Sequence, residues 1–96
     1  MLETLTVRTP NKAALRPLLK SALGHERNML GLGLKRTRER LAEFERRFGM
    51  TSLEFERRLN VAQLDETVEF TDWRMEIGML RLLEQQDQAL RDATLD

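Results

Sequence analysis

The sequence predicts a mainly α-helical fold: a helical hairpin or bundle with an N-terminal strand, a long kinked helix, a short capped helix and a long C-terminal helix. Apolar residues recur at helical spacing over residues 11–48 and again beyond Trp73. A glycine stop and a capping signal separate these two patterns at Gly49 and Thr51. The chain of 96 residues, 41% hydrophobic and 33% charged, has the size and balance of one folded domain over 1–96.

The composition excludes several classes of function. There is no cysteine, so neither a disulfide framework nor thiolate chemistry is available, and a single histidine leaves few catalytic bases. No run approaches the roughly 18 apolar residues of a membrane span. The N-terminal sequence MLETLTVRTP lacks the basic start and apolar body of a signal peptide. We therefore expect a cytoplasmic protein that does not contact a membrane.

The charge is balanced overall but unevenly distributed along the chain. Residues 1–48 hold eleven Lys and Arg against five Asp and Glu, and residues 49–96 hold the reverse. The basic excess is greatest at Lys35, Arg36, Arg38, Arg40, Arg46 and Arg47, and the acidic excess at Asp65, Glu66, Glu69, Asp72 and Glu76. Two interpretations stay open: the halves neutralise each other in the fold, or they form a basic surface for nucleic acid or an acidic partner and an acidic surface for a basic partner.

Residues 1–9 predict a strand or an arm. Leu5 and Val7 lie on opposite sides of Thr6, and β-branched residues are enriched. An isolated strand leaves its amides and carbonyls unpaired. We therefore expect this segment to fray, to pair with the same strand of a second copy, or to add to a partner's sheet.

The long helix predicted over residues 11–48 contains several helix-disfavouring residues. Pro17 lacks an amide and disfavours helix at the preceding residue, which predicts either a start or a kink there. Gly24 predicts either a break or a tolerated interior glycine. Gly31 and Gly33 each cost about 1 kcal/mol relative to Ala, and the pattern leaves open whether the helix continues through them. Close approach of another backbone explains Gly31 and Gly33 better than a phosphate loop, because no strand precedes them and no Lys-Ser/Thr follows.

The stop and restart of helix near residue 50 is the clearest local signal. Gly49 accepts the left-handed conformation that ends a helix at no steric cost. Thr51 and Glu54 fit a capping box, in which each side chain accepts a hydrogen bond from an amide of the new turn. A short helix is therefore predicted to begin after Thr51 and to end near residues 60–62.

The last helix is predicted to begin at a cap formed by Thr71 or Asp72. Its apolar side is formed by Trp73, Ile77, Leu80, Leu83 and Leu90. Met75, Met79 and Leu82 widen this stripe beyond what one groove needs. The width predicts that the helix is covered on two sides, the second by another chain.

The sequence contains no constellation of catalytic or metal-binding residues. His25 and Glu26 are the only base–carboxylate pair, and adjacent residues on a helix do not face each other. The acidic linker lacks the oxygen-ligand spacing of a calcium loop. We therefore predict no enzyme activity, no metal and no cofactor. The charged residues instead predict helix ion pairs at i, i+4: Glu43 with Arg47, and Glu54 with Arg58.

The stretch LAEFERRFGMTSLEFERRL, followed by VEFTDWRMEIGMLRLLEQ, resembles a group of small helical proteins of bacterial and archaeal toxin–antitoxin loci. Their pattern is a long helix ending in Phe-Glu-basic-basic-aromatic-Gly-Met, then a Ser/Thr restart, a Glu-Phe pair, an acidic linker and a Trp helix. The matching positions are Phe44, Glu45, Arg46, Arg47, Phe48, Gly49, Met50, Thr51, Ser52, Glu54, Phe55, Asp65, Phe70 and Trp73. The chain departs from the pattern in the linker, where Asn60 to Asp65 replace a Gly-Glu-Leu-Gly-Asp-like turn.

The resemblance implies an antitoxin-side or partner-binding component. We accordingly predict a non-enzymatic protein–protein binding component, an antitoxin-like neutraliser or small subunit, that forms a homo-oligomer and binds a cognate protein, such as a toxin. The residues assigned to the partner or oligomer interface are Phe44, Phe48, Phe55, Phe70, Trp73, Met75, Met79 and Leu82. Nucleic acid is not the favoured partner, because glutamates interrupt the basic run and pair with its arginines.

The alternative is a DNA-binding regulator similar to ribbon-helix-helix proteins. In that arrangement alternate strand residues enter the major groove, which here are Thr4, Thr6 and Arg8. Pro17 inside the first helix, and the glycines inside the second, count against it.

Overall fold

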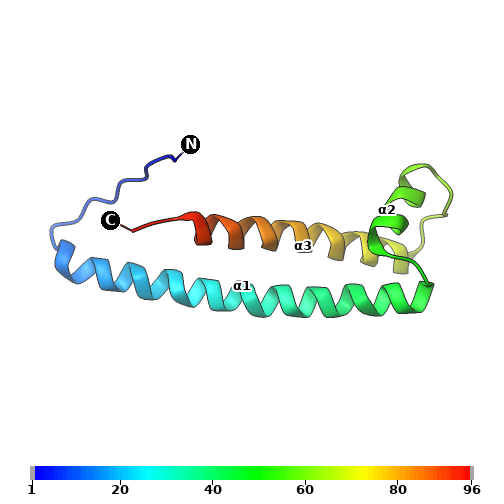
Figure 1. The fold of residues 1–96 in the computed structure, drawn as a ribbon, viewed down its shortest axis with the longest axis horizontal. Coiled ribbons are helices and arrows are strands. Elements are labelled where there is room, and N and C mark those ends of the chain that lie inside the picture. The colour runs from blue at the N-terminus through cyan, green and yellow to red at the C-terminus, as the bar shows by residue number, and fades with distance from the viewer. Residues whose placement is uncertain (1, 96) are drawn as a thin grey trace.

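The computed structural model describes residues 2–95 and contains, within that range, three α-helices and no strand. The helices are α1 (Lys12–Phe48), α2 (Ser52–Asn60) and α3 (Val68–Asp92), which confirms the mainly α-helical class. α1 and α3 run antiparallel as a hairpin, and α2 lies at its closed end, beside the start of α3 (Figure 1). The resulting molecule is elongated, 58 Å along its longest axis.

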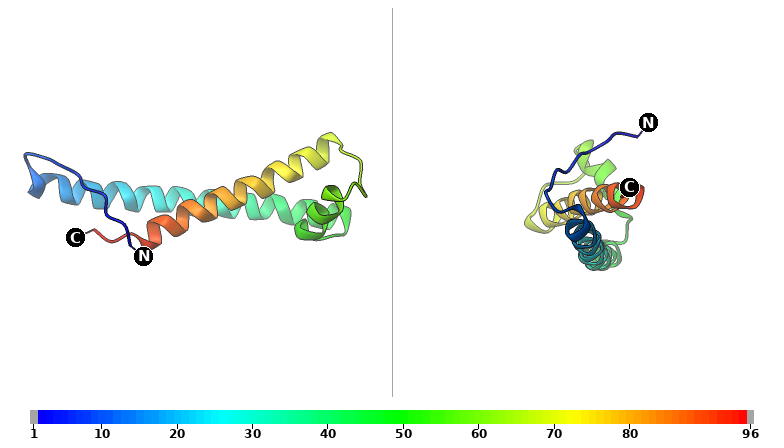
Figure 2. Two further views of the ribbon diagram at one scale, coloured as in Figure 1. Left: turned by 90° about the horizontal axis from the view of Figure 1, so that it is seen from above. Right: turned by 90° about the vertical axis from the view of Figure 1, so that its left-hand side faces the viewer.

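The N-terminal segment is an extended arm. Its backbone forms no ladder, and the side chains of Leu2 and Leu5 are 86% and 96% exposed. Figure 2 shows the arm leaving the start of α1 and running back as a separate thread at the open end of the hairpin. The structure therefore does not support the predicted N-terminal strand, since a strand needs a neighbour and residues 2–95 supply none.

α1 is a single helix of 37 residues that neither starts at Pro17 nor breaks at its glycines. Its cap is Asn11, whose side chain accepts a hydrogen bond from the Ala14 amide. Pro17 lies in the second turn, where the missing amide removes only one hydrogen bond near the helix end. The helix curves gently along its length and shows no sharp bend (Figure 1). The predicted long helix is confirmed, but not its predicted kink.

The predicted stop and restart is confirmed. Gly49 is left-handed (φ 66°), and its amide donates to the Glu45 carbonyl oxygen at 2.9 Å. The Thr51 hydroxyl accepts from the Glu54 amide at 3.1 Å and so caps α2. The other half of the capping box is different: the Glu45 carboxylate accepts from the Ser52 amide at 2.6 Å. The Glu54 carboxylate instead binds arginines of its own helix.

α2 ends at Asn60, as predicted, with an unusual left-handed residue. Ala62 has φ 58°, its amide donates to the Leu59 carbonyl, and the Gln63 amide donates to the Arg58 carbonyl. These two hydrogen bonds form a Schellman motif, in which glycine is the usual left-handed residue. The left-handed residue that follows α2 is therefore an alanine, at a position that glycine fits without steric cost.

The cap of α3 lies four residues before Thr71. It is Thr67, whose hydroxyl accepts from the Phe70 amide at 3.1 Å. The prediction of Thr71 or Asp72 as the cap is therefore wrong. Both residues lie inside the first turns, and the Thr71 hydroxyl donates to the Glu66 carboxylate at 2.9 Å.

The core follows the seam between α1 and α3. The buried apolar residues are Leu30, Leu34, Leu41, Phe55, Trp73 and Ile77. Gly33 of α1 lies against Leu83 of α3, where an added Cβ would be 3.4 Å from a methyl group, an ordinary van der Waals distance. A Cβ added to Gly24, Gly31 or Gly33 would meet no backbone of another element within 4 Å, so the predicted close approach of another backbone is not seen within residues 2–95.

Ion pairs across the hairpin join the basic and acidic halves of the chain. Arg40 pairs with Glu76 at 2.8 Å, and Arg47 pairs with Glu69 at 2.9 Å. The i, i+4 pattern predicted that Arg47 pairs with Glu43 of its own helix. In the structure Arg47 instead pairs with Glu69 of α3. These contacts favour mutual neutralisation of the halves at the closed end of the hairpin.

Candidate functional site

Five of the eight predicted interface residues lie together in the core at the closed end of the hairpin. They are Phe44 and Phe48 of α1, Phe55 of α2, and Phe70 and Trp73 of α3. Phe55 and Trp73 are 0% exposed, while the other three are half-buried. This aromatic cluster holds α2 against both long helices.

The indole of Trp73 is the centre of the aromatic cluster. The Phe55 ring stacks on it with a centroid separation of 3.9 Å and an interplanar angle of 1°. The Phe44 ring is also nearly parallel to the indole, at 5.5 Å and 6°. The indole N–H donates to the Ser52 hydroxyl at 2.9 Å, so its one polar group is satisfied. A buried ring with a satisfied donor serves as a structural anchor.

The other three predicted interface residues are exposed on α3. Met75, Met79 and Leu82 are 67%, 46% and 47% exposed, and Val68 is 79% exposed. Val68, Met75 and Leu82 are spaced by seven residues, which places them on one side of the helix. Trp73 and Ile77 are buried, and Met75 and Met79 follow each by two residues, about 200° further around the helix. Val68, Met75, Met79 and Leu82 therefore form an apolar surface that faces away from α1, here called the α3 outer stripe.

α1 also carries apolar residues that the chain itself does not cover. Leu18, Met29 and Leu32 are 65%, 50% and 64% exposed. All ten residues from 20 to 29 are exposed, although they lie within a regular helix. α3 therefore buries none of the side chains of α1 between residues 20 and 29.

The residues of the alternative DNA-binding interpretation lie in the N-terminal arm. Thr4, Thr6 and Arg8 are exposed, and none of them belongs to a strand. The arrangement that would carry them into a major groove is absent from residues 2–95. The structure therefore gives this alternative no support.

The carboxylates with shifted pKa values lie on α2, and each forms ion pairs with arginines. Hydrogen bonds from Arg57 and Arg58 lower the pKa of Glu54 to about 2. A hydrogen bond from Arg81 of α3 lowers the pKa of Glu56. Glu54 pairs with two arginines of its own helix, α2, and Glu56 forms an ion pair that joins α2 to α3. Both carboxylates are engaged by arginines, and we assign them a structural role.

His25 and Glu26 are both exposed on α1. In residues 2–95 no group of three or more His, Cys, Asp or Glu side chains is placed to hold a metal ion. None of the three described helices is long and apolar enough to cross a membrane.

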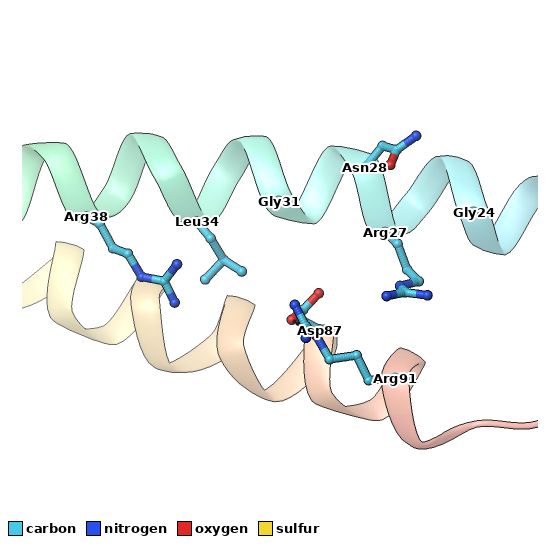
Figure 3. Close-up of a pocket in the computed structure, with 8 residues that line it drawn as sticks. All are labelled: Gly24, Arg27, Asn28, Gly31, Leu34, Arg38, Asp87 and Arg91. Carbon is cyan, nitrogen blue, oxygen red and sulfur yellow. Dashed lines mark hydrogen bonds and ion pairs between the residues drawn. The ribbon is translucent and has the colours of Figure 1, made fainter.

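A groove between the open halves of α1 and α3 is the feature that the sequence interpretation missed. It encloses about 540 Å³ and is lined by Gly24, Arg27, Asn28, Gly31, Leu34, Arg38, Asp87 and Arg91 (Figure 3). The signal in the sequence was the alignment of two glycines and two arginines on one side of α1. The contribution of α3 depends on the register between helices, which no local pattern reports.

Comparison with protein families, with curated proteins and with solved structures found no match to this chain.

Proposed function

We propose that this chain is a non-enzymatic protein-binding component that presents the α3 outer stripe to a protein partner. The observation that carries the proposal is the exposure of four large apolar side chains at helical spacing on α3. They are Val68, Met75, Met79 and Leu82. An exposed apolar stripe on a regular helix is the surface by which helices dock into grooves or bundles.

The composition of the stripe fits binding by adaptable packing. Two of its members are methionines, whose flexible and polarizable side chains fill irregular apolar surfaces. Glycine at position 78 lies between them, and a Cβ there would meet nothing within 4 Å. The backbone of α3 is therefore open to close approach by another helix.

The hairpin architecture supports association with a second helical layer. α1 and α3 bury only one face each, whereas a helical bundle buries its apolar faces on all inner sides. Without another protein, a second copy of the chain is the available cover, and two hairpins would form a four-helix bundle. We therefore propose a homodimer as the resting form.

The more specific role, an antitoxin-like neutraliser, rests on the resemblance to proteins of toxin–antitoxin loci. The features that carry the resemblance are the end of the long helix at Phe48 and Gly49, the short helix capped by Thr51, and the Trp73 helix. Each of these features is a structural element of this chain, and the last of them, α3, is the helix that carries the α3 outer stripe. The partner expected on this basis is the product of the adjacent reading frame.

Co-expression with the product of the adjacent reading frame tests the proposal. We expect a complex on size-exclusion chromatography, lost in the Met75→Glu, Leu82→Glu double variant because buried unpaired carboxylates disrupt an apolar contact. The matched control is Leu53→Glu on α2, where the side chain is 76% exposed and lies outside the stripe. A complex that survives the double variant would show that another surface binds the partner.

A further inference from the structure

Two glycines of α1 leave part of the floor of the groove at the open end of the hairpin without side chains. Gly24 and Gly31 lie seven residues apart, which is about two turns, and therefore on one side of α1. A Cβ added to either would meet nothing within 4 Å, so neither glycine is required by packing within the chain. Each costs about 1 kcal/mol of helix stability relative to alanine. The space above them is open to the backbone of another helix, since small residues let helix axes approach.

A line of cationic side chains runs beside the glycines. Arg27 and Arg38 are eleven residues apart, which corresponds to three turns and a rise of about 16 Å on the same side of α1. Both are exposed, and neither forms an ion pair within residues 2–95. Arg91 faces them from α3 and is held at 2.7 Å by Asp87 (Figure 3).

We propose that this groove binds an acidic α-helix of a protein partner, with carboxylates about three turns apart on Arg27 and Arg38 and small residues over Gly24 and Gly31. The charge complementarity follows from the two arginines that lack partners among residues 2–95. The spacing follows from helix geometry, since two parallel helices repeat the same rise per residue. The inference rests on the proposed protein-binding function and adds a second contact surface with a defined partner chemistry.

A helix fits the groove better than a nucleic acid. The α3 wall contributes the carboxylate of Asp87, and the same end of α3 carries Glu84 and Asp92. A continuous chain of phosphates would meet these carboxylates with like-charge repulsion. An acidic helix presents carboxylates only at chosen positions and leaves neutral residues opposite α3.

Binding of a synthetic peptide measured by isothermal titration calorimetry tests the proposal. The probe is an alanine-rich helix of about 18 residues with two glutamates eleven positions apart. Its twin has glutamine at both positions. We expect the glutamate peptide to bind about tenfold tighter, corresponding to two partly exposed charge pairs, and this difference to shrink as salt rises.

Matched variants assign the binding to the groove. Arg27→Gln with Arg38→Gln should remove the difference between the two peptides. Arg36→Gln with Arg46→Gln removes the same two charges from exposed positions of α1 outside the groove and should keep it. Gly31→Leu should weaken both peptides without lowering the melting temperature, because leucine fills open space and favours helix.

Three results would overturn the proposal. One is equal affinity of the glutamate and glutamine peptides, including no binding of either at millimolar concentration. The second is equal loss in the two double-arginine variants, which would indicate general attraction by net charge. The third is tighter binding of a short DNA duplex that depends on Arg27 and Arg38. None of these results involves the α3 outer stripe, so failure here leaves the complex tested with Met75 and Leu82 unaffected.

Discussion

The Phe55 ring lies face to face with the indole of Trp73, 3.9 Å between centroids, and both side chains are fully buried. The two residues come from α2 and α3 and are separated by an exposed linker. The short α2 has nine residues, too few for a stable isolated helix. Its position therefore depends on this stacked pair and on the ion pair between Glu56 and Arg81.

The stacked pair predicts a large loss of stability on truncation. Phe55→Ala should lower the free energy of unfolding by about 3–5 kcal/mol, since it removes a fully buried ring and leaves a cavity against the indole. Urea denaturation followed by tryptophan fluorescence measures the change. Leu53→Ala on the same helix is the control, because that side chain is 76% exposed and should cost less than about 0.5 kcal/mol. Equal effects of the two variants would mean that α2 does not pack through Phe55.

Gly49 and Ala62 are the two left-handed residues of the described chain, and they predict opposite effects of substitution. Gly49→Val should destabilise by roughly 1 kcal/mol or more, because a β-branched side chain disfavours positive φ. Ala62→Gly should stabilise by up to about 1 kcal/mol, because it removes the Cβ from a Schellman position. Melting temperatures of the two variants check the signs. A loss of stability in Ala62→Gly would contradict the left-handed end of α2.

The ion pairs of Glu54 predict how stability depends on pH. Arg57 and Arg58 lower the pKa of Glu54 from 4.5 to about 2 in the folded chain. A carboxylate with a depressed folded pKa stabilises the fold at pH values above its unfolded pKa, and this contribution is lost as pH falls toward the folded pKa. The urea concentration at the denaturation midpoint should therefore decrease as the pH is lowered from about 5 to about 2. The Glu54→Gln variant should show a shallower fall over the same window, with the remainder due to Glu56 and other carboxylates.

The parts of the fold that were predictable from sequence are those set by local chemistry. Gly49 and Thr51 act within one turn of helix, so their residue types alone defined the end of α1 and the start of α2. The cap of α3 was misplaced because Thr67, Thr71 and Asp72 are all competent caps, and packing of Phe70 and Trp73 into the core selects among them.

The failures concern features that depend on distant segments. Alternation in residues 2–8 is a valid strand pattern, but a strand also needs a partner, and the rest of the described chain is helix and linker. Among the predicted interface residues, the side chains of Phe55 and Trp73 are fully buried within the chain, whereas that of Met75 is exposed. Both kinds of residue recur at helical spacing, so periodicity alone could not separate the buried side of α3 from its outer side.

The α3 outer stripe predicts self-association when no other protein is present. We expect sedimentation equilibrium at micromolar concentration to give twice the 11.3 kDa mass of one chain. Met75→Glu with Leu82→Glu should shift the equilibrium to the monomer without lowering helix content in circular dichroism, because both side chains are exposed in the single chain. Leu53→Glu, which adds one exposed carboxylate on α2, should remain dimeric. A native chain that sediments as a monomer would remove the homodimer, and a dimer that persists in the double variant would place the interface on another surface, such as the one around Leu18 and Leu32 of α1.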